Sequence, residues 1–332
     1  MQPPTLVHQN LDQYFAPEGK YLWDSWFLNR ADGVHAFYLC SPNNGDPEAR
    51  HHNSVSIGHA FSSDLHSWTD LGLALEPSSD INRFDSLSLW TGDIFEHENE
   101  FYLYYTGRRK SEFWTQRIGL ATSKDLKTFS RVNEFCLDAD PRYYDTYSEL
   151  NSLQFPPAFR DPCILKDPIS SKFIMVFAAR HKGCKDNLYN GCIGWATSDN
   201  LLDWEQHPPL LIPSGIDQLE TPQLIYAQGY YYLLFSTWEK AFAHNSKYAA
   251  ASGLHGFRCK FLGDEWEPLN GNSQILTNGE FIYDVRMVCY RQDTILALGW
   301  LNYDENGNFI GRLSKPIPFT LNGLELQPTY IS

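Results

Sequence analysis

The sequence predicts an all-β chain that folds as a single-domain, five-bladed β-propeller. Short aromatic-rich or alternating runs, bounded by Gly, Asp, Asn and Pro, take the place of helical periodicity. Pairs of such runs recur five times, and a third strand with a common turn follows several of the pairs. Similar units of about four strands each can close radially and leave few exposed edges. A β-sandwich or a two-domain all-β chain is the alternative.

Each predicted blade begins with an inner strand and its neighbour. The second members of the pairs recur at intervals of roughly 60–75 residues, in the upper part of the range for known repeat units. In chain order the pairs read YLWDSWFL with VHAFYLCSP, SLWTGDIF with EFYLYYTGR, FRDPCIL with KFIMVFAAR, LETPQLIY with YYYLLFSTW, and FIYDVRMV with TILALGWLN.

The third element of the repeat is a strand of small residues that ends in a Ser-x-Asp/Asn-Leu turn. It reads IGHAFSSDLHSW, IGLATSKDLKTF and IGWATSDNLLDW, with a weaker version, GLHGFRCKFLGDEW, after the fourth pair. We place the propeller at residues 21–332, after an N-terminal extension at 1–20, and find no spare length for a C-terminal β-sandwich.

The composition of the chain narrows the classes of molecule that the protein could bind and the compartment in which we expect it. A formal net charge of -14 argues against nucleic acid and anionic membrane surfaces, because both select basic patches. No apolar run is long enough to span a bilayer, and the start, MQPPTLVHQN, lacks the segments of a signal peptide. Seven scattered cysteines without a CxxC pair look like free thiols. We therefore expect a cytoplasmic location, and neither a metal nor a cofactor.

Acidic residues recur on the predicted inner strands. When these strands are aligned on their neighbours, the equivalent positions are Asp24, Thr91, Asp161, Glu220 and Asp284. Each acid by itself is more typical of a cap or a turn. Several carboxylates in one small volume repel one another, and a fold has little reason to accept that cost without a ligand, a metal or a reaction.

Aromatic rings and arginines accompany these acids. Trp23, Trp26, Trp90, Tyr283, Arg160 and Arg286 lie beside them in the sequence. Aromatic faces suit the C–H faces of a sugar ring, while charged groups bond its hydroxyls, so a small carbohydrate is the predicted ligand. Trp26 can equally be ordinary propeller core. The predicted substrate-binding residues are Trp23, Trp90, Thr91, Asp93, Arg160, Tyr283 and Asp284.

Glycoside hydrolysis needs two carboxyl groups with opposite tasks, one ionised and one protonated. Glu220, the longest of the central acids, suits the proton donor, and Asp24 is a plausible nucleophile. Asp161, held by Arg160 or by sugar hydroxyls, would stabilise an oxocarbenium-like transition state.

These motifs resemble glycoside hydrolase families 32 and 68, the invertases, fructanases and levansucrases. WDSW at 23–26 is similar to the nucleophile motif of family 68, FRDP at 159–162 to the RDP motif of both families, and ETP at 220–222 to their acid/base motif. GHAFSSDLHSWTDLGLALEP, followed by LWTGDIFEHENEFYLYYTG, resembles family 32, and the resemblance covers about residues 21–318.

The resemblance implies Asp24 as nucleophile, Asp161 as transition-state stabiliser and Glu220 as acid/base. It implies retaining transfer of a β-fructofuranosyl group, with sucrose as the expected donor, to water or to another sugar. The chain departs from the families at its first site, which lacks the W-x-N-D-P-N-G pattern of family 32. It departs again at Asp93, where a serine is usual, and this acid adds a charge near the nucleophile.

Three other functions stay open on the sequence. An inverting α-L-arabinofuranosidase or β-xylosidase of the family 43 kind shares the propeller and three acids. A non-catalytic carbohydrate-binding propeller would keep the aromatic wall and lose one acid. A phosphorylase would need a basic rim, for which GRRK at 107–110 and RHK at 180–182 are the candidates. Residues 132–157 could form a lid or a surface loop, and His51 and His52 could contact an acceptor.

Overall fold

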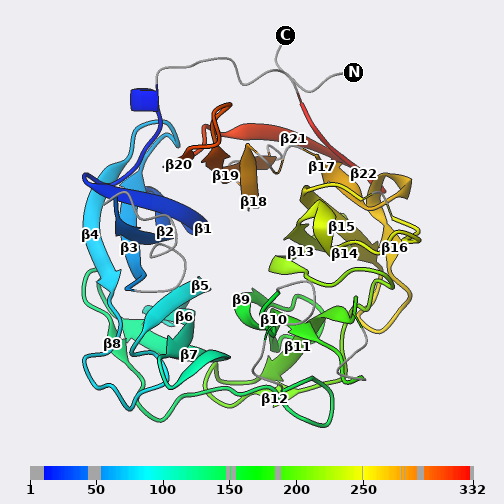
Figure 1. The fold of residues 1–332 in the computed structure, drawn as a ribbon, viewed down its shortest axis with the longest axis horizontal. Helices are drawn as coiled ribbons and strands as arrows, with labels where there is room; N and C mark the ends of the chain where they lie inside the picture. Colours follow the sequence, from blue (N-terminus) through cyan, green and yellow to red (C-terminus); the bar gives the residue numbers. More distant parts are fainter. Residues whose placement is uncertain are drawn as a thin grey trace.

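The computed structural model describes residues 11–43, 54–146, 150, 155–183, 188–248, 250–277, 279, 281–289 and 295–329. Five antiparallel sheets surround a central axis, which confirms the predicted five-bladed propeller (Figure 1). The described residues contain no α-helix, and none of their three 3-10 helices, η1 (Leu11–Gln13), η2 (Glu239–Ala241) and η3 (Leu269–Gly271), could cross a bilayer.

The blades follow one another in chain order. Blade 1 contains β1 (Lys20–Arg30), β2 (Gly33–Pro42), β3 (Ser56–Ser62) and β4 (Thr69–Leu75). Blade 2 contains β5 (Ser88–His97), β6 (Glu100–Arg109), β7 (Glu112–Ser123) and β8 (Ser130–Arg131). Blade 3 contains β9 (Phe159–Lys166), β10 (Phe173–Arg180), β11 (Gly191–Ser198) and β12 (Glu205–Gln206).

The last two blades carry a fifth strand each. Blade 4 contains β13 (Glu220–Ala227), β14 (Tyr230–Thr237), β15 (Gly253–Cys259) and β16 (Glu267–Pro268), with β17 (Gln274–Leu276) paired to β15. Blade 5 contains β18 (Ile282–Cys289), β19 (Ile295–Tyr303), β21 (Ile317–Asn322) and β22 (Glu325–Pro328), with β20 (Phe309–Leu313) paired to β19.

The apolar core lies between neighbouring blades. The second strand of a blade is covered on both faces, so its side chains need not alternate between apolar and polar. Strand β10, for example, is buried along its whole length. This explains why the second members of the sequence pairs read as continuous apolar runs.

The predicted turn after the third strand is present in three blades. In blade 1 the Ser62 hydroxyl accepts the N–H of Leu65 at 2.8 Å, and the Asp64 carboxylate accepts the N–H of Ser67 at 2.7 Å. The leucine adopts a positive φ of 65° and is buried, so packing holds it in a conformation that is rare for its residue type. The equivalent residues are Ser123, Asp125 and Leu126, and Ser198, Asn200 and Leu201.

Part of the predicted N-terminal extension packs against the propeller. Strand β1 begins at Lys20, and before it the carbonyl of Phe15 accepts the N–H of Leu313 at 2.8 Å. Arg312 also donates to the carbonyls of Leu11 and Tyr14, at 3.0 and 3.1 Å. Residues 11–15 therefore lie against blade 5.

Every inner strand is bulged at the same level, and these bulges position the site. The pairing register shifts after Trp23, Trp90, Arg160, Glu220 and Tyr283 in β1, β5, β9, β13 and β18. A bulge bends its strand and redirects the next side chain. It also tolerates proline, which cannot donate to a ladder, and this accounts for Pro162 and Pro222 directly after the bulged residues.

Hydrogen bonds from side chains near the bulges join each blade to the next around the central axis, and we call these bonds clasps. Each clasp gives a backbone N–H or a carboxylate a partner from the next blade, where no sheet ladder can supply one. Round the ring, the clasps are Thr91 Oγ1 to Asp24 at 2.7 Å, Ile164 N to Asp93 at 2.6 Å, Thr221 N to Asp161 at 3.0 Å, Met287 N to Gln223 at 2.9 Å, and Ser25 N to Asp284 at 3.0 Å.

Candidate active site

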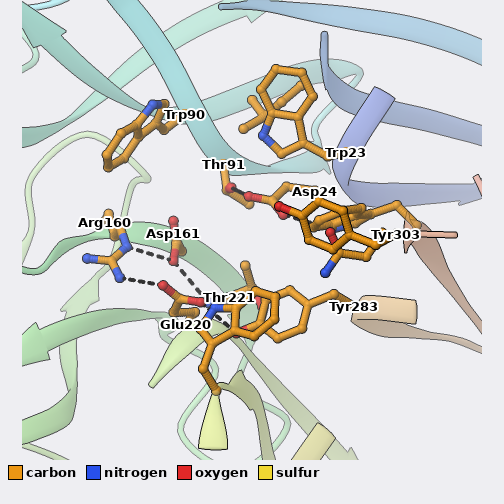
Figure 2. Close-up of a pocket in the computed structure, with 14 residues that line it drawn as sticks. Trp23, Asp24, Trp90, Thr91, Arg160, Asp161, Glu220, Thr221, Tyr283 and Tyr303 are labelled. Carbon is orange, nitrogen blue, oxygen red and sulfur yellow. Dashed lines mark hydrogen bonds and ion pairs between the residues drawn. The ribbon is translucent and has the colours of Figure 1, made fainter. Parts of the chain in front are cut away.

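A cavity of about 290 Å³ lies at the centre of the ring, and the inner strands of all five blades contribute to it (Figure 2). Its volume is at the small end for ligand pockets, which favours one compact ligand. The lining residues are Trp23, Asp24, Leu39, Trp90, Thr91, Arg160, Asp161, Glu220, Thr221, Trp238, Tyr283, Trp300, Asn302 and Tyr303.

The bulges divide the inner-strand residues into two sets. The pre-bulge position of each strand holds Trp23, Trp90, Arg160, Glu220 and Tyr283, and the bulge position holds Asp24, Thr91, Asp161, Thr221 and Asp284. The sequence alignment was therefore wrong by one residue in blade 4. Glu220 is equivalent to Arg160, and Thr221 occupies the position of the other acids.

Four of the five bulge positions have a left-handed backbone conformation. Asp24, Asp161, Thr221 and Asp284 have positive φ angles of 37°, 58°, 50° and 44°. Such angles are several-fold enriched for aspartate but are outliers for a β-branched residue such as threonine. Strained backbone persists where the surrounding structure holds it in place, and it is common at functional sites. The strained bulge positions therefore point to the centre of the ring as the functional site.

Asp24 is held by two donors from different blades. The Thr91 hydroxyl donates to Oδ2 at 2.7 Å, and the Trp300 indole N–H donates to Oδ1 at 3.0 Å. Burial raises the pKa of Asp24 well above its ordinary value, and the negative charge of Asp284 raises it further. Both carboxylate oxygens are therefore oriented, as a nucleophile requires.

Asp161 lies across the cavity from Asp24 and is almost fully buried (Figure 2). Its Oδ2 accepts the N–H of Thr221 at 3.0 Å and lies 3.4 Å from Nε of Arg160. Burial raises the pKa of Asp161 to about 6, against the opposing charge of Arg160. A carboxylate in this low-dielectric position, held by a backbone N–H and beside a guanidinium, is suited to stabilise a cationic transition state.

Glu220 is more accessible than Asp161, the other predicted catalytic acid beside Arg160. Its side chain is 21% exposed, compared with 4% for Asp161. Arg160 Nη2 donates to Oε1 at 3.0 Å, and the Tyr283 hydroxyl donates to Oε2 at 2.6 Å. Two fixed donors and partial exposure leave this carboxyl oriented and able to exchange a proton with a ligand.

Aromatic rings form the wall of the cavity. Tyr283 stacks on Trp238 with ring centroids 4.1 Å apart, and Trp300 meets Tyr283 edge to face. Trp90 lies over the guanidinium of Arg108 at 4.0 Å. These contacts fix the ring planes before a ligand arrives. Trp26, in contrast, is 1% exposed and stacks on Phe37, so it belongs to the core.

Several lining residues were missed by the sequence analysis. Trp300, Asn302 and Tyr303 lie on β19, Leu39 lies on β2, and Trp238 follows β14. The alignment considered only inner strands, whereas these residues come from second strands and from the turn beyond one. The sequence could have indicated Trp300. The strand that contains LGWLN pairs with the inner strand of blade 5, and this pairing sets Trp300 opposite Tyr283.

Two predicted substrate-binding residues do not line the cavity. Asp93 lies two residues beyond Thr91 on β5 and accepts the N–H groups of Ile164 and Ile94. Asp284 is buried and accepts Ser25 N–H at 3.0 Å and Arg286 Nε at 2.8 Å. Each carboxylate is engaged by a strand of a neighbouring blade, and direct contact of Asp93 and Asp284 with a substrate stays a prediction.

Comparison with known proteins identifies the family. A model of the glycosyl hydrolases family 32 N-terminal domain matches residues 15–312. The chain belongs to glycosyl hydrolase family 32. This membership confirms the resemblance to the fructoside-cleaving clan and removes the support for a family 43 pentosidase.

Several relatives of this family 32 chain carry the names of sucrose-cleaving enzymes. A levansucrase, LscC, of Pseudomonas savastanoi pv. glycinea is 26% identical over 220 residues, which are 57% of this chain and 49% of that protein. An extracellular sucrase of Zymomonas mobilis subsp. mobilis is 24% identical over 306 residues, 77% of this chain and 70% of that protein. The chain spans about half the length of the levansucrases that it matches.

Solved structures share the fold over nearly the whole chain. An inulosucrase from Halalkalicoccus jeotgali, bound to kestose, has a TM-score of 0.79 and 25% identity, covering 95% of this chain and 90% of that one. Bacillus subtilis levansucrase has a TM-score of 0.72 at 16% identity, covering 96% and 91%, and shows the fold alone.

Each of the two basic motifs of this family 32 chain places its first arginine in the protein interior. Arg108 is fully buried beneath Trp90, and Arg180 is buried in an ion pair with Asp217. These two guanidinium groups are therefore enclosed and do not lie at a rim where they could bind phosphate. A phosphorylase would have to rely on the exposed lysines of the motifs, Lys110 and Lys182.

The remaining site predictions concern the segment 132–157 and the pair His51 and His52. In the segment 132–157, Tyr144 is 1% exposed and donates from its hydroxyl to the carbonyl of His207 at 2.6 Å, so this part packs on blade 3. His51 and His52, like residues 147–149 and 151–154, lie outside the described residues. In the part of the chain that the structure describes, no cluster of three His, Cys, Asp or Glu side chains could hold a metal ion.

The acidic limb of kcat/KM is expected to shift to lower pH when Asp284 is replaced by Asn. Asp24, the predicted nucleophile, would have to be ionised to attack, so activity is expected to fall as the pH drops through the pKa of Asp24. The Asp284 charge raises that pKa, and its removal lowers it. A pH profile of sucrose cleavage measures the effect, with the exposed Asp32→Asn as control. An unmoved limb would show that the Asp284 charge does not reach Asp24.

Proposed function

We propose that this chain is a retaining β-fructofuranosidase that transfers the fructosyl group of sucrose to water and, in competition, to a second sugar. One observation carries the proposal. Asp24 and Glu220 reach the same small cavity from different blades, each held by two donors. A nucleophile and a proton donor on opposite sides of one bond are what retaining glycosidases need.

In the first step the Asp24 carboxylate attacks the anomeric carbon of the fructosyl unit. A bond forms from a carboxylate oxygen to that carbon while the glycosidic C–O bond breaks, and its electron pair stays on the departing oxygen. Glu220 gives its proton to this oxygen, so glucose leaves as a neutral alcohol. The buried Asp161 carboxylate stabilises the positive charge that develops on the ring.

In the second step Glu220 acts as a base. It takes the proton of a water or a sugar hydroxyl, whose oxygen attacks the anomeric carbon and releases Asp24. Two successive inversions restore the β configuration. The cation of Arg160, 3.0 Å from Glu220 Oε1, stabilises the ionised form that the first step leaves.

Sucrose as donor is supported by the relatives rather than by the cavity alone. The matched proteins are named levansucrase and sucrase, and the inulosucrase structure holds kestose. The aromatic wall and small volume suit one sugar unit in the cavity with its neighbour towards the mouth. The cytoplasmic location stays a prediction from the sequence.

Product analysis with sucrose tests the proposal. The pure protein is incubated with sucrose, and free glucose and free fructose are quantified over time, with Glu220→Gln as control. Equal release that the substitution abolishes is expected for hydrolysis, and glucose in excess of fructose for transfer to sugars. With methanol as acceptor, methyl β-fructofuranoside is expected, and the α anomer would rule out retention. No release from sucrose would overturn sucrose as donor.

A further inference from the structure

Arg286 is a buried arginine on β18, the inner strand of blade 5. Its side chain is 3% exposed, and it is not among the residues that line the catalytic cavity. Arginine stays charged in proteins, and a buried charge is costly unless it is paired and hydrogen-bonded. The contacts of Arg286 therefore indicate what the fold gains from this charge.

The guanidinium of Arg286 joins three blades. Its Nε donates to Oδ1 of Asp284 on the same strand at 2.8 Å, and its Nη1 donates to the carbonyl of Pro222 in blade 4 at 3.4 Å. The other oxygen of Asp284, Oδ2, accepts the N–H of Ser25 in blade 1 at 3.0 Å. Arg286 is thus bonded to blade 4 directly and to blade 1 through Asp284.

The two backbone groups at the ends of this chain of bonds adjoin the predicted nucleophile and the predicted acid/base. Ser25 directly follows Asp24 in the bulge of β1, and Pro222 lies two residues after Glu220 in the bulge of β13. Asp24 has a φ of 37°, a conformation that the surrounding structure must hold in place. The chain of bonds through Arg286 supplies such support from outside both strands.

Arg286 also supplies a positive charge to carboxyl groups from three blades, Asp284 on β18, Asp93 on β5 and Asp161 on β9. Burial raises the pKa of each of these groups, and the charge of Arg286 opposes the rise. Ionised Asp284 can accept the Ser25 N–H and the guanidinium together, with one oxygen for each. The cation therefore helps to keep the link to blade 1 formed.

We propose that Arg286 is a positioning residue that holds the strands of Asp24 and Glu220 at a fixed position relative to each other. This inference rests on the proposed function and names a further residue on which that function depends. Retaining glycosidases need their two carboxyl groups about 5–5.5 Å apart. A misplacement of about 1 Å can cost about 10²-fold in rate. Because Arg286 acts through backbone groups, its loss is expected to lower kcat and leave KM nearly unchanged.

Steady-state kinetics with sucrose tests the inference. Arg286→Met is expected to lower kcat by about 10²-fold, while KM stays within about threefold of the parent value. Arg286→Lys keeps a cation beside Asp284 and is expected to recover part of kcat, but not all, because an ammonium lacks the planar fork of a guanidinium. The matched control is Arg142→Met. Arg142 also bonds a carboxylate two positions away, Asp140, but its side chain is 70% exposed, so kcat should not change.

A double substitution tests whether Arg286 acts through Asp284. Arg286→Met leaves a buried carboxylate without its cation and can unfold the protein, which denaturant unfolding would show. Arg286→Met combined with Asp284→Asn removes both charges, and this variant then decides. Its kcat, measured at the pH optimum of each variant, is expected to lie about 10²-fold below the parent value, like that of Arg286→Met alone, because the two residues form one link.

The outcomes separate this inference from the proposed function. A folded Arg286→Met or double variant with the kcat of the parent would overturn the positioning role. Losses of the two single substitutions that multiply in the double variant would overturn it too, and so would a raised KM at unchanged kcat, which would place Arg286 in substrate binding. If the parent protein cleaves neither sucrose nor β-fructofuranosyl fluoride, the proposed function falls and this inference falls with it.

Discussion

Replacing Glu220 by Gln is expected to lower kcat for sucrose by about 10²–10⁴-fold, the usual contribution of a general acid–base group. The amide keeps the size of the side chain next to Arg160 and Tyr283 but cannot give a proton to the departing glucose oxygen. Steady-state kinetics with sucrose measures the loss. Glu325→Gln, an exposed acid on β22, is the matched control and should retain full activity.

A donor that needs no acid separates the role of Glu220 from that of Asp24. β-Fructofuranosyl fluoride releases fluoride without protonation, so the Glu220→Gln variant should react with it much faster than with sucrose. Azide should then accept the fructosyl group, because it needs no base. Asp24→Asn should stay inactive with both donors, since it lacks the nucleophile. Equal rescue of both variants, or of neither, would contradict the assigned roles.

Replacing Asp217 by Ala is expected to lower the free energy of unfolding by about 3–5 kcal/mol, because it leaves the Arg180 cation buried without its carboxylate. The two side chains are 1% and 0% exposed, and they join β10 to the segment before β13. Denaturant unfolding of the variant and the parent protein gives the difference.

The controls for Asp217 use an exposed pair and a double substitution. Lys172 and Asp199, in the same blade, form an ion pair with side chains 46% and 79% exposed, and Lys172→Met should change stability by no more than about 1 kcal/mol. Arg180→Met combined with Asp217→Leu removes both charges and should recover much of the stability. A loss in the double variant as large as in Asp217→Ala would show that packing, rather than charge, is responsible.

Most of the fold could be predicted because its signals are local. Alternation, turn residues and apolar runs depend on the φ/ψ preferences and burial of a few consecutive residues, and here they repeat five times. The Ser-x-Asp-Leu turn is such a signal, since all its hydrogen bonds join residues within three positions of one another. The N-terminal segment escaped prediction because its partners, such as Arg312, are distant in sequence.

The candidate site was predicted less completely than the fold. Asp24, Asp161 and Glu220, with Trp23, Trp90, Thr91, Arg160 and Tyr283, lie on inner strands and line the cavity as the repeat indicated. The repeat could not show the bulge that shifts Glu220 from the position of Asp161 to that of Arg160. It also could not show that Arg108 and Arg180 are buried, because their surroundings come from other strands and loops.

The sequence by itself determined the propeller and the inner strand that carries each acid, and it predicted the chemistry that those acids perform. The tertiary structure alone decided which carboxylates line the central cavity and which do not. Asp284 illustrates the difference: its partner Ser25 is 259 residues away and becomes a neighbour only when the last blade closes on the first. Closure of the ring creates the cavity and the hydrogen bonds that hold Asp24. It also buries Asp24, which raises its pKa, and brings the charge of Asp284 close enough to raise that pKa further. A local sequence pattern cannot encode such contacts between blades.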